Sequence, residues 1–289
     1  MVRRLILLFF LFFTVITQAQ LAPREITIGI LPGGDPEVAK RGYLEIAKAL
    51  QTELQIPVNV YLSKNYSGLI EAMKTKKVDF AFFTAMTYVF AEKEAGAKVL
   101  LKKVWNEPFY YSIILSKKKS GIKTVEGLKN KRFGFVDEKS TSGYLYPKVL
   151  MKKKKVEPKE TKFSGSHSQS IVWLDQGEVD AVAVFSDDKE GKGSAYVKYS
   201  KSPQPVQQVR VLWVSDPIPN DPFCVRQDFY DQYPKLTHNL MFALIDVVDK
   251  LKSSSKDVKE TVGAQGFIPA TQRQYDPVRE MVKELDLHL

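Results

Sequence analysis

Short apolar runs alternate with longer amphipathic runs through the first part of this chain, and this alternation constrains its fold more than any other feature. Residues 25–31, 57–62 and 78–83 have the length and apolar content of buried strands. The segments at 38–54 and 66–76 repeat their apolar residues at helical spacing. Strands that alternate with helices through short joints predict a mostly parallel sheet with helices on both faces, the doubly wound α/β class. In sheets of this class, ligands bind beyond the carboxyl ends of the strands.

The alternation breaks at residues 99–115, where two β-rich stretches follow one another, and it then begins again. Strands are predicted at 132–136 and 181–185, and a strand at 209–214 would carry the chain back. A chain of 289 residues is long enough for two domains of about 100–150 residues each. We therefore predict two α/β lobes with a ligand cleft between them. The predicted first lobe comprises residues 20–114 and 211–289, and the second comprises 115–210.

Three hydroxyl side chains in a row, Ser140, Thr141 and Ser142, stand before a helix predicted at 144–153. The first backbone N–H groups of a helix have no intrahelical partner, and the helix dipole adds partial positive charge there. Gly143 would let a ligand approach the backbone closely. The segment predicts a site for an oxyanion such as phosphate or phosphonate. The alternative is ordinary helix capping, which needs only one of the three hydroxyls.

The N-terminus indicates export. A basic start, an apolar run at 5–16 and small residues before Gln20 predict a secretory signal peptide at 1–19. The apolar run is shorter than the roughly 20 residues that a membrane span needs. No cysteine follows the run, so we expect no lipid anchor and a periplasmic or secreted protein.

Composition narrows the possible partners. The single cysteine, Cys224, can form neither an internal disulfide nor a multi-cysteine metal site, and its apolar neighbours suggest a buried small hydrophobe. Without the predicted signal peptide, 41 basic residues against 33 acidic ones give a charge of +8, which favours an anionic ligand. The lysine runs at 117–119 and 152–155 come without any nucleic-acid-binding motif. We expect no nucleic-acid partner, no metal and no cofactor.

Six short motifs occur in a characteristic order. They are at 65–73 (NYSGLIEAM), 77–81 (KVDFA), 140–144 (STSGY), 165–167 (GSH), 177–181 (GEVDA) and 216–219 (DPIP). In these motifs the chain resembles the periplasmic binding proteins of ABC transporters for phosphate, phosphite and phosphonate. The resemblance covers nearly all of the mature sequence. It implies a type II-like, two-lobe fold that closes over an oxyanion and delivers it to the membrane permease of an importer.

The resemblance also implies roles for particular residues. In that family the Ser-Thr-Ser segment and a histidine of the second lobe hold the phosphorus oxyanion, while tyrosines of the first lobe close over it. The ligand-binding residues implied here are Ser140, Thr141, Ser142, His167, Tyr66 and Tyr88. For His167 the alternative is a capping or surface role, and for both tyrosines it is packing.

Asp187 follows the strand predicted at 181–185 and is a further candidate. Its carboxylate would meet a cationic group on an organic phosphonate, such as an aminoalkyl chain. The alternative is a solvated loop acid beside Asp188.

Two other functions compete with ligand delivery. Ser142, His167 and Asp187 can be drawn as a hydrolytic triad, but the serine lacks the Gly-x-Ser-x-Gly context of a nucleophile elbow, and no zinc-binding motif is present. We therefore expect a binding protein and not a phosphoester hydrolase or other enzyme. The same fold could instead present its ligand to a membrane sensor kinase. The sequence leaves uptake and sensing open, as it does the identity of the oxyanion, the oligomeric state and the role of Cys224.

Overall fold

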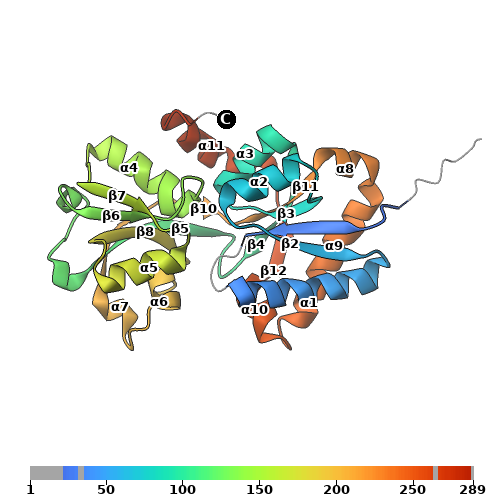
Figure 1. Cartoon of the computed structure of the whole chain (residues 1–289), viewed down its shortest axis with the longest axis horizontal. Helices are drawn as coiled ribbons and strands as arrows, with labels where there is room; N and C mark the ends of the chain where they lie inside the picture. Colours follow the sequence, from blue (N-terminus) through green and yellow to red (C-terminus); the bar gives the residue numbers. More distant parts are fainter. Residues whose placement is uncertain (1–21, 32–35, 263–265, 288–289) are drawn as a thin grey trace, which may run out of the picture.

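The computed structural model describes residues 22–31, 36–262 and 266–287, so the signal peptide predicted at 1–19 lies outside the described residues. Two six-stranded sheets lie side by side, each with helices on both faces (Figure 1). We call the first sheet with its helices lobe 1, at the right of Figure 1, and the second sheet with its helices lobe 2, at the left. None of the helices in the described ranges combines the length and hydropathy needed to cross a membrane.

The sheet of lobe 1 has the strand order β12, β4, β11, β3, β1, β2. Its strands are β1 (Ile26–Ile30), β2 (Val58–Leu62), β3 (Phe80–Phe82), β4 (Ala97–Val104), β11 (Pro222–Arg226) and β12 (Gly266–Pro269). Strands β2, β1, β3 and β4 run in one direction, and β11 and β12 run in the other. The strands predicted at 25–31, 57–62 and 78–83 are therefore confirmed as β1, β2 and β3, and they are parallel.

Alternate residues of these strands serve two cores. Phe80 and Phe82 face one core and Ala81 faces the other, because successive strand residues point to opposite sides of a sheet. Cys224 of β11 is fully buried in the second core, as its apolar neighbours predicted. The helices are α1 (Pro36–Leu54), α9 (Pro234–Leu251) and α10 (Lys256–Val262) on one face, α2 (Tyr66–Lys74), α3 (Ala85–Ala95) and α11 (Asp276–Glu284) on the other, and α8 (Gln227–Gln232) after β11.

The sheet of lobe 2 has the order β10, β5, β8, β6, β7, and β9 also pairs with β5. Its strands are β5 (Phe109–Lys117), β6 (Arg132–Phe135), β7 (Glu160–Phe163), β8 (Ala181–Ser186), β9 (Val209–Val214) and β10 (Ile218–Pro219). Its helices are α4 (Tyr146–Lys154), α5 (His167–Gln176), α6 (Ala195–Tyr199) and α7 (Pro205–Gln208). Only β5 runs against the other strands described in this sheet. Both sheets are thus mostly parallel with antiparallel members, as the sequence predicted.

The boundaries predicted for the lobes need correction. Residues 114 and 115 both lie in β5, and residues 210 and 211 both lie in β9, and these strands pair with each other inside lobe 2. The chain crosses between the sheets at 105–108, before β5, and at 220–221, after β10. The prediction missed these points because an apolar strand pattern does not say which sheet the strand will join.

A largely buried ion pair joins Asp79, the residue before β3, to Arg226 of β11 and predicts a large effect on stability. Asp79 accepts hydrogen bonds from the Thr27 amide at 2.9 Å and from the Arg226 guanidinium at 3.2 Å. Removing one partner of a buried pair costs about 3–5 kcal/mol, so for this less buried pair we expect Asp79→Ala to lower the free energy of unfolding by about 2–3 kcal/mol. Chemical denaturation would measure the loss.

Asp228→Ala is the matched control, because Asp228 pairs with the same Arg226 but its side chain is 47% exposed. An exposed pair contributes at most about 1 kcal/mol, so we expect a small loss. Equal losses in the two variants would contradict this account of Asp79.

Candidate ligand-binding site

A cleft of about 540 Å³ lies between the lobes and is lined by residues of both. Six of the predicted site residues are in its lining, namely Tyr66, Ser140, Thr141, Ser142, His167 and Asp187. The seventh, Tyr88, is not. The structure therefore brings the candidates of both lobes together at one cleft, with one exception that is described below.

The three consecutive hydroxyls, which we call the cradle, form the start of a helix and not a loop before it. A π-helical turn, η3 (Thr141–Leu145), continues directly into α4. Ser140 is the N-cap, and its Oγ accepts a hydrogen bond from the Gly143 amide at 3.1 Å. The predicted start of the helix at Tyr144 was therefore too late. Ordinary capping accounts for the Ser140 hydroxyl and for neither of the other two.

Thr141 and Ser142 retain donor groups that a ligand could use. Thr141 Oγ1 accepts a hydrogen bond from the Met86 amide at 2.8 Å, so its own proton remains free to be donated. The backbone amides of Thr141 and Ser142 donate to no acceptor in the described part of the chain, although both residues are buried. The carbonyl of Ser142 accepts from Ser112 Oγ at 2.6 Å, which fixes the turn. Unpaired amides at a helix N-terminus are typical oxyanion donors.

His167 is the first residue of α5 and is 9% exposed. Burial lowers the pKa of His167 to about 3, so the imidazole is neutral at physiological pH. Its Nδ1 is buried and has no hydrogen-bond partner in the residues that the structure describes. The ring packs edge-on against Phe185, with centroids 5.0 Å apart. A buried imidazole nitrogen without a partner beside a cleft is the expected state of a ligand-binding histidine before its ligand arrives.

Two tyrosine hydroxyls lie against the cradle. Tyr66, at the start of α2, lies near Ser140; burial raises the pKa of Tyr66, and the nearby Ser140 hydroxyl opposes the rise. Tyr110 of β5 lies near Thr141 and Ser142, and burial, with Asp221 adding to it, raises the pKa of Tyr110 well above its ordinary value. Both phenols therefore stay protonated and can donate to an anion.

Tyr88 does not belong to the cleft, and packing, the alternative left open from the sequence, accounts for it. It lies one turn inside α3, where its hydroxyl donates to Glu92 Oε1 at 2.7 Å. Its ring packs edge-on against Tyr275 at 4.9 Å in the core of lobe 1. The residue of α3 that does reach the cleft is Thr84, the N-cap. The start of a helix faces the cleft, and a residue one turn later points elsewhere.

The cleft is not a basic pocket. Among the described residues, the lining contains two lysines, Lys103 and Lys198, and three acids, Asp187, Asp221 and Glu260. The positive surplus predicted to draw an anion therefore does not gather in the lining. Helices α2, α3 and α5, together with the helix that begins at η3, instead place their N-termini there. Helix dipoles and neutral donors supply the favourable potential for an anion.

The geometry does not support a hydrolytic triad. Asp187 lines the cleft after β8, and burial raises the pKa of Asp187 to about 6, with Lys198 acting in the opposite direction. No hydrogen bond joins this carboxylate to His167, whose Nδ1 has no partner in the described part of the chain. Within the described ranges, no group of His, Cys, Asp and Glu side chains is arranged to hold a metal ion.

Sequence reasoning missed several lining residues at the two crossings between the lobes. Trp105 and Tyr110 belong to or flank the first crossing, and Asn220 and Asp221 form the second. Burial lowers the pKa of Lys103, but Tyr43 and the nearby Asp221 raise it by more, so this amine is charged. The signal that could have found these residues is their position, because the floor of a two-lobe cleft is made by the segments that cross it.

Gly143 predicts a test of the cradle's geometry. A Cβ added there would meet Val136 Cγ2 at 2.4 Å and Ser140 Oγ at 2.9 Å, so the turn would have to move. Overpacking of this kind costs about 1–3 kcal/mol, and we expect Gly143→Ala to lower the unfolding free energy by that amount and to weaken ligand binding at least about tenfold. Calorimetric titration and denaturation would measure both.

Gly127→Ala serves as the control within lobe 2, because a Cβ at Gly127 meets nothing closer than 3.4 Å. We expect its binding to match that of the unmodified protein. Unchanged binding in Gly143→Ala as well would show that the turn tolerates displacement and would contradict the geometry described here.

Two mostly parallel α/β lobes around a cleft with helix N-termini, hydroxyls and unpaired amides define a solute-binding protein of the two-lobe class. The family described as ABC transporter, phosphonate, periplasmic substrate-binding protein matches residues 28–275, and the chain belongs to this family. The family resemblance inferred from the six motifs is therefore confirmed. Members of this family are substrate-binding components of transporters and not enzymes.

Individual relatives support the assignment. The chain is 23% identical over 275 residues to the probable ABC transporter phosphite binding protein PhnD1 of Prochlorococcus marinus (strain MIT 9301), with 91% of each covered. It is 27% identical over 301 residues to the phosphate-import protein PhnD of Mycolicibacterium smegmatis (strain ATCC 700084 / mc(2)155), covering 92% of this chain and 87% of that one.

A solved structure agrees with the fold. The structure of Prochlorococcus marinus PhnD1 in complex with methylphosphonate has a TM-score of 0.76 and 22% identity, covering 92% of this chain and 99% of that one. This likeness confirms the two-lobe fold.

Proposed function

We propose that this protein binds a phosphorus oxyanion in the cradle and delivers it to an ABC importer. The observation that carries the proposal is the start of η3, where buried hydroxyls and two backbone amides without acceptors in the described chain face the same cleft as the unpartnered Nδ1 of His167. Tyr66 and Tyr110 would complete the shell of donors. The ligand-binding residues of this proposal are Ser140, Thr141, Ser142, His167, Tyr66 and Tyr110.

Neutral donors are sufficient for tight binding. A hydrogen bond to a charged group contributes about 1.5–3 kcal/mol. Micromolar affinity requires about 8 kcal/mol in total, so a handful of such bonds reaches it after the costs of association are met. The donors are already held in place by Ser112 and Met86, so little ordering is needed when the ligand arrives.

Closure of the cleft would couple the ligand to both lobes. Met86 at the start of α3 in lobe 1 donates to Thr141 in lobe 2, and Tyr66 of lobe 1 lies beside Ser140. An anion held by the cradle would add contacts to the same lobe 1 residues and so favour the closed arrangement. The closed form is the one that a transporter would recognise.

The setting of this activity is the periplasm, which the family's description names. We propose that the predicted signal peptide at 1–19 directs export and is then removed. The partner would be the membrane permease of the importer, because the family serves ABC transporters. Presentation to a sensor kinase has no observation in its favour.

The ligand class is proposed from two lines of support. The relatives are named for phosphite and for phosphate, and the solved relative holds methylphosphonate, so all three are phosphorus oxyanions. The cradle offers the hydroxyls and amides that such a group needs. We therefore propose phosphonate, phosphite or phosphate as the bound group.

Isothermal titration calorimetry of protein stripped of carried-over ligand tests the proposal. The titrants are phosphate, phosphite, methylphosphonate and methanesulfonate, the last being a tetrahedral anion of similar shape without an ionisable hydroxyl. We expect a Kd in the micromolar range or below for at least one phosphorus compound, and at least about tenfold weaker binding of the sulfonate. No measurable heat from any phosphorus compound up to millimolar concentrations would contradict it.

A further inference from the structure

The cleft continues past the cradle into a second group of side chains. The His167 ring contacts Phe185, whose centroid lies 6.3 Å from that of Tyr199. Lys198 precedes Tyr199 in the chain. Its amine lies 5.6 Å from the centroid of the Tyr199 ring and 5.2 Å from that of the Trp105 ring. These residues are all in the lining. A ligand whose anionic group lies at the cradle would therefore extend its substituent along this path toward Lys198.

We call Trp105, Asp187, Lys198, Tyr199 and Glu260 the α6 subsite. A cleft of about 540 Å³ lies within the range of about 300–1,000 Å³ that holds organic ligands, so it has room for more than a small inorganic anion. The aromatic rings of Trp105 and Tyr199 both lie close to the Lys198 amine. The subsite thus combines room, aromatic surface and charge.

The charged side chains of this subsite form no direct ion pairs with one another. Burial lowers the pKa of Lys198, and the nearby Glu260 and Asp187 act in the opposite direction. Within the described residues, however, neither carboxylate forms an ion pair with Lys198 at 4.0 Å or less, and the Asp187 carboxylate accepts no hydrogen bond. Charged groups that line a cleft without a direct partner gain most from a ligand that supplies one.

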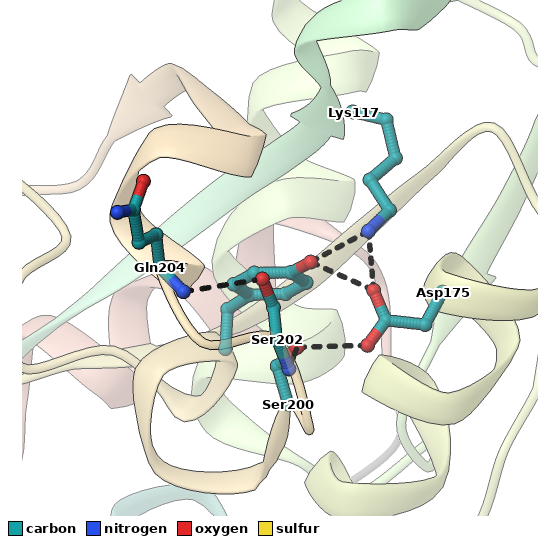
Figure 2. Close-up of polar contacts among 6 residues, drawn as sticks. Lys117, Asp175, Ser200, Ser202 and Gln204 are labelled. Atoms are coloured by element: carbon teal, nitrogen blue, oxygen red, sulfur yellow. Dashed lines mark hydrogen bonds and ion pairs between the residues drawn. The ribbon is translucent and has the colours of Figure 1, made fainter.

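The short helix that carries the subsite is held in place from behind. Tyr196 of α6 donates its hydroxyl to Asp175 Oδ1 at 2.7 Å, and Lys117 donates to Tyr196 at 2.6 Å and also pairs with Asp175. Ser200, just after the helix, donates to Asp175 Oδ2 at 2.8 Å. Figure 2 shows Lys117 and Ser200 converging on the Asp175 carboxylate. A five-residue helix is not stable alone, so this network sets the position of Lys198 and Tyr199.

We propose that the α6 subsite recognises a zwitterionic substituent, so that the preferred ligands are phosphonates that carry both an ammonium and a carboxylate group. The ligand carboxylate pairs with Lys198, and the ligand ammonium pairs with Asp187 and Glu260. This inference rests on the proposed function, because the cradle must hold the phosphonate group.

Ligands with a single charge on the substituent fit less well. An aminoalkyl chain satisfies the two acids but brings a second cation close to Lys198. A carboxyalkyl chain satisfies Lys198 but brings an anion close to Asp187 and Glu260. Only a substituent with both charges matches both signs of the lining, and mismatched charges in a partly buried site are the usual basis of discrimination.

Calorimetric titration with four phosphonates tests the inference. The probes are methylphosphonate, 2-aminoethylphosphonate, 2-carboxyethylphosphonate and 2-amino-3-phosphonopropionate, which differ only in the substituent charges and the few atoms that carry them. We expect the last, which carries both charges, to bind at least about tenfold tighter than methylphosphonate and tighter than either singly charged probe.

Two variants separate the contributions of the two charges. In Lys198→Met, the advantage of the zwitterion over 2-aminoethylphosphonate should fall to about one. In Asp187→Asn its advantage over 2-carboxyethylphosphonate should also fall, with Glu260 retaining part of it. Lys201→Met and Glu190→Gln remove like charges from exposed neighbouring positions outside the lining, and the affinity ratios should stay as in the unmodified protein. These ratios report specificity independently of any general loss of binding.

The outcomes distinguish this inference from the proposed function. Methylphosphonate binding with no gain from the zwitterionic substituent, or ratios that neither variant changes, overturns the inference and leaves the proposed function standing. If none of the four phosphonates binds, and neither phosphate nor phosphite binds, both the inference and the proposed function are overturned.

Discussion

Thr141→Val lowers the affinity for the phosphorus oxyanion by about 10- to 150-fold, because it removes one hydroxyl donor to a charged ligand, a contribution of about 1.5–3 kcal/mol. The substitution keeps the shape of the side chain, so the effect isolates the hydroxyl. It also leaves the buried Met86 amide without its acceptor at 2.8 Å, which costs about 1–3 kcal/mol of unfolding free energy. Titration calorimetry gives the first quantity and chemical denaturation gives the second.

Thr141→Ser is the matched control, since it keeps the hydroxyl and removes only a methyl group. We expect its affinity to remain within a few-fold of the unmodified protein and its stability loss to be smaller than that of the valine variant. Equal affinities for the valine and serine variants would show that the hydroxyl makes no bond to the ligand, and the cradle would then be wrong.

The second large expected effect is a loss of stability at acidic pH that depends on His167. Burial lowers the pKa of His167 to about 3, whereas the unfolded chain protonates near its ordinary value of 6.5. Between these pH values the unfolded state binds more protons than the folded state, so the free energy of unfolding falls as the pH falls. The slope approaches about 1.4 kcal/mol per pH unit, which gives a loss of about 2 kcal/mol between pH 7 and pH 5.

Denaturation of the unmodified protein and of His167→Asn at pH 7, 6 and 5 measures this contribution. The stability difference between the two proteins should decrease by about 2 kcal/mol in favour of the variant over that range. Asp187, whose pKa burial raises to about 6, acts with the opposite sign but is present in both proteins and cancels in the difference. Parallel pH profiles would mean that His167 is solvated and free to protonate in the folded state.

Much of the fold could be predicted because local patterns carry it. The strands β1, β2 and β3 are short apolar runs bounded by turns, and their parallel pairing follows from the helices between them. The position of the three hydroxyls at the start of a helix could be predicted, because Ser and Thr are favoured there. His167 became a candidate ligand residue through the family resemblance of its motif, and not through the local sequence pattern around it.

The rest depended on contacts between distant parts of the chain. Strand β5 joins lobe 2 because β8 and β9 pair with it. The sequence of β5 itself does not indicate these partners. Tyr88 was misplaced because its partner in packing, Tyr275, comes from the far end of the chain. Tyr110 was missed because it reaches the cradle only where the chain crosses between the lobes. Local periodicity carries no information about such contacts.

The measurement that tests the central claim most directly is a crystal structure of the protein with methylphosphonate bound. Hydrogen bonds to the phosphonate oxygens at about 2.7–3.0 Å are predicted from the cradle hydroxyls, from the backbone amides of Thr141 and Ser142 and from the imidazole of His167. A phosphonate group held instead by Lys103 or Lys198, with the cradle hydroxyls unengaged, would contradict the claim that neutral donors at the start of a helix bind the anion.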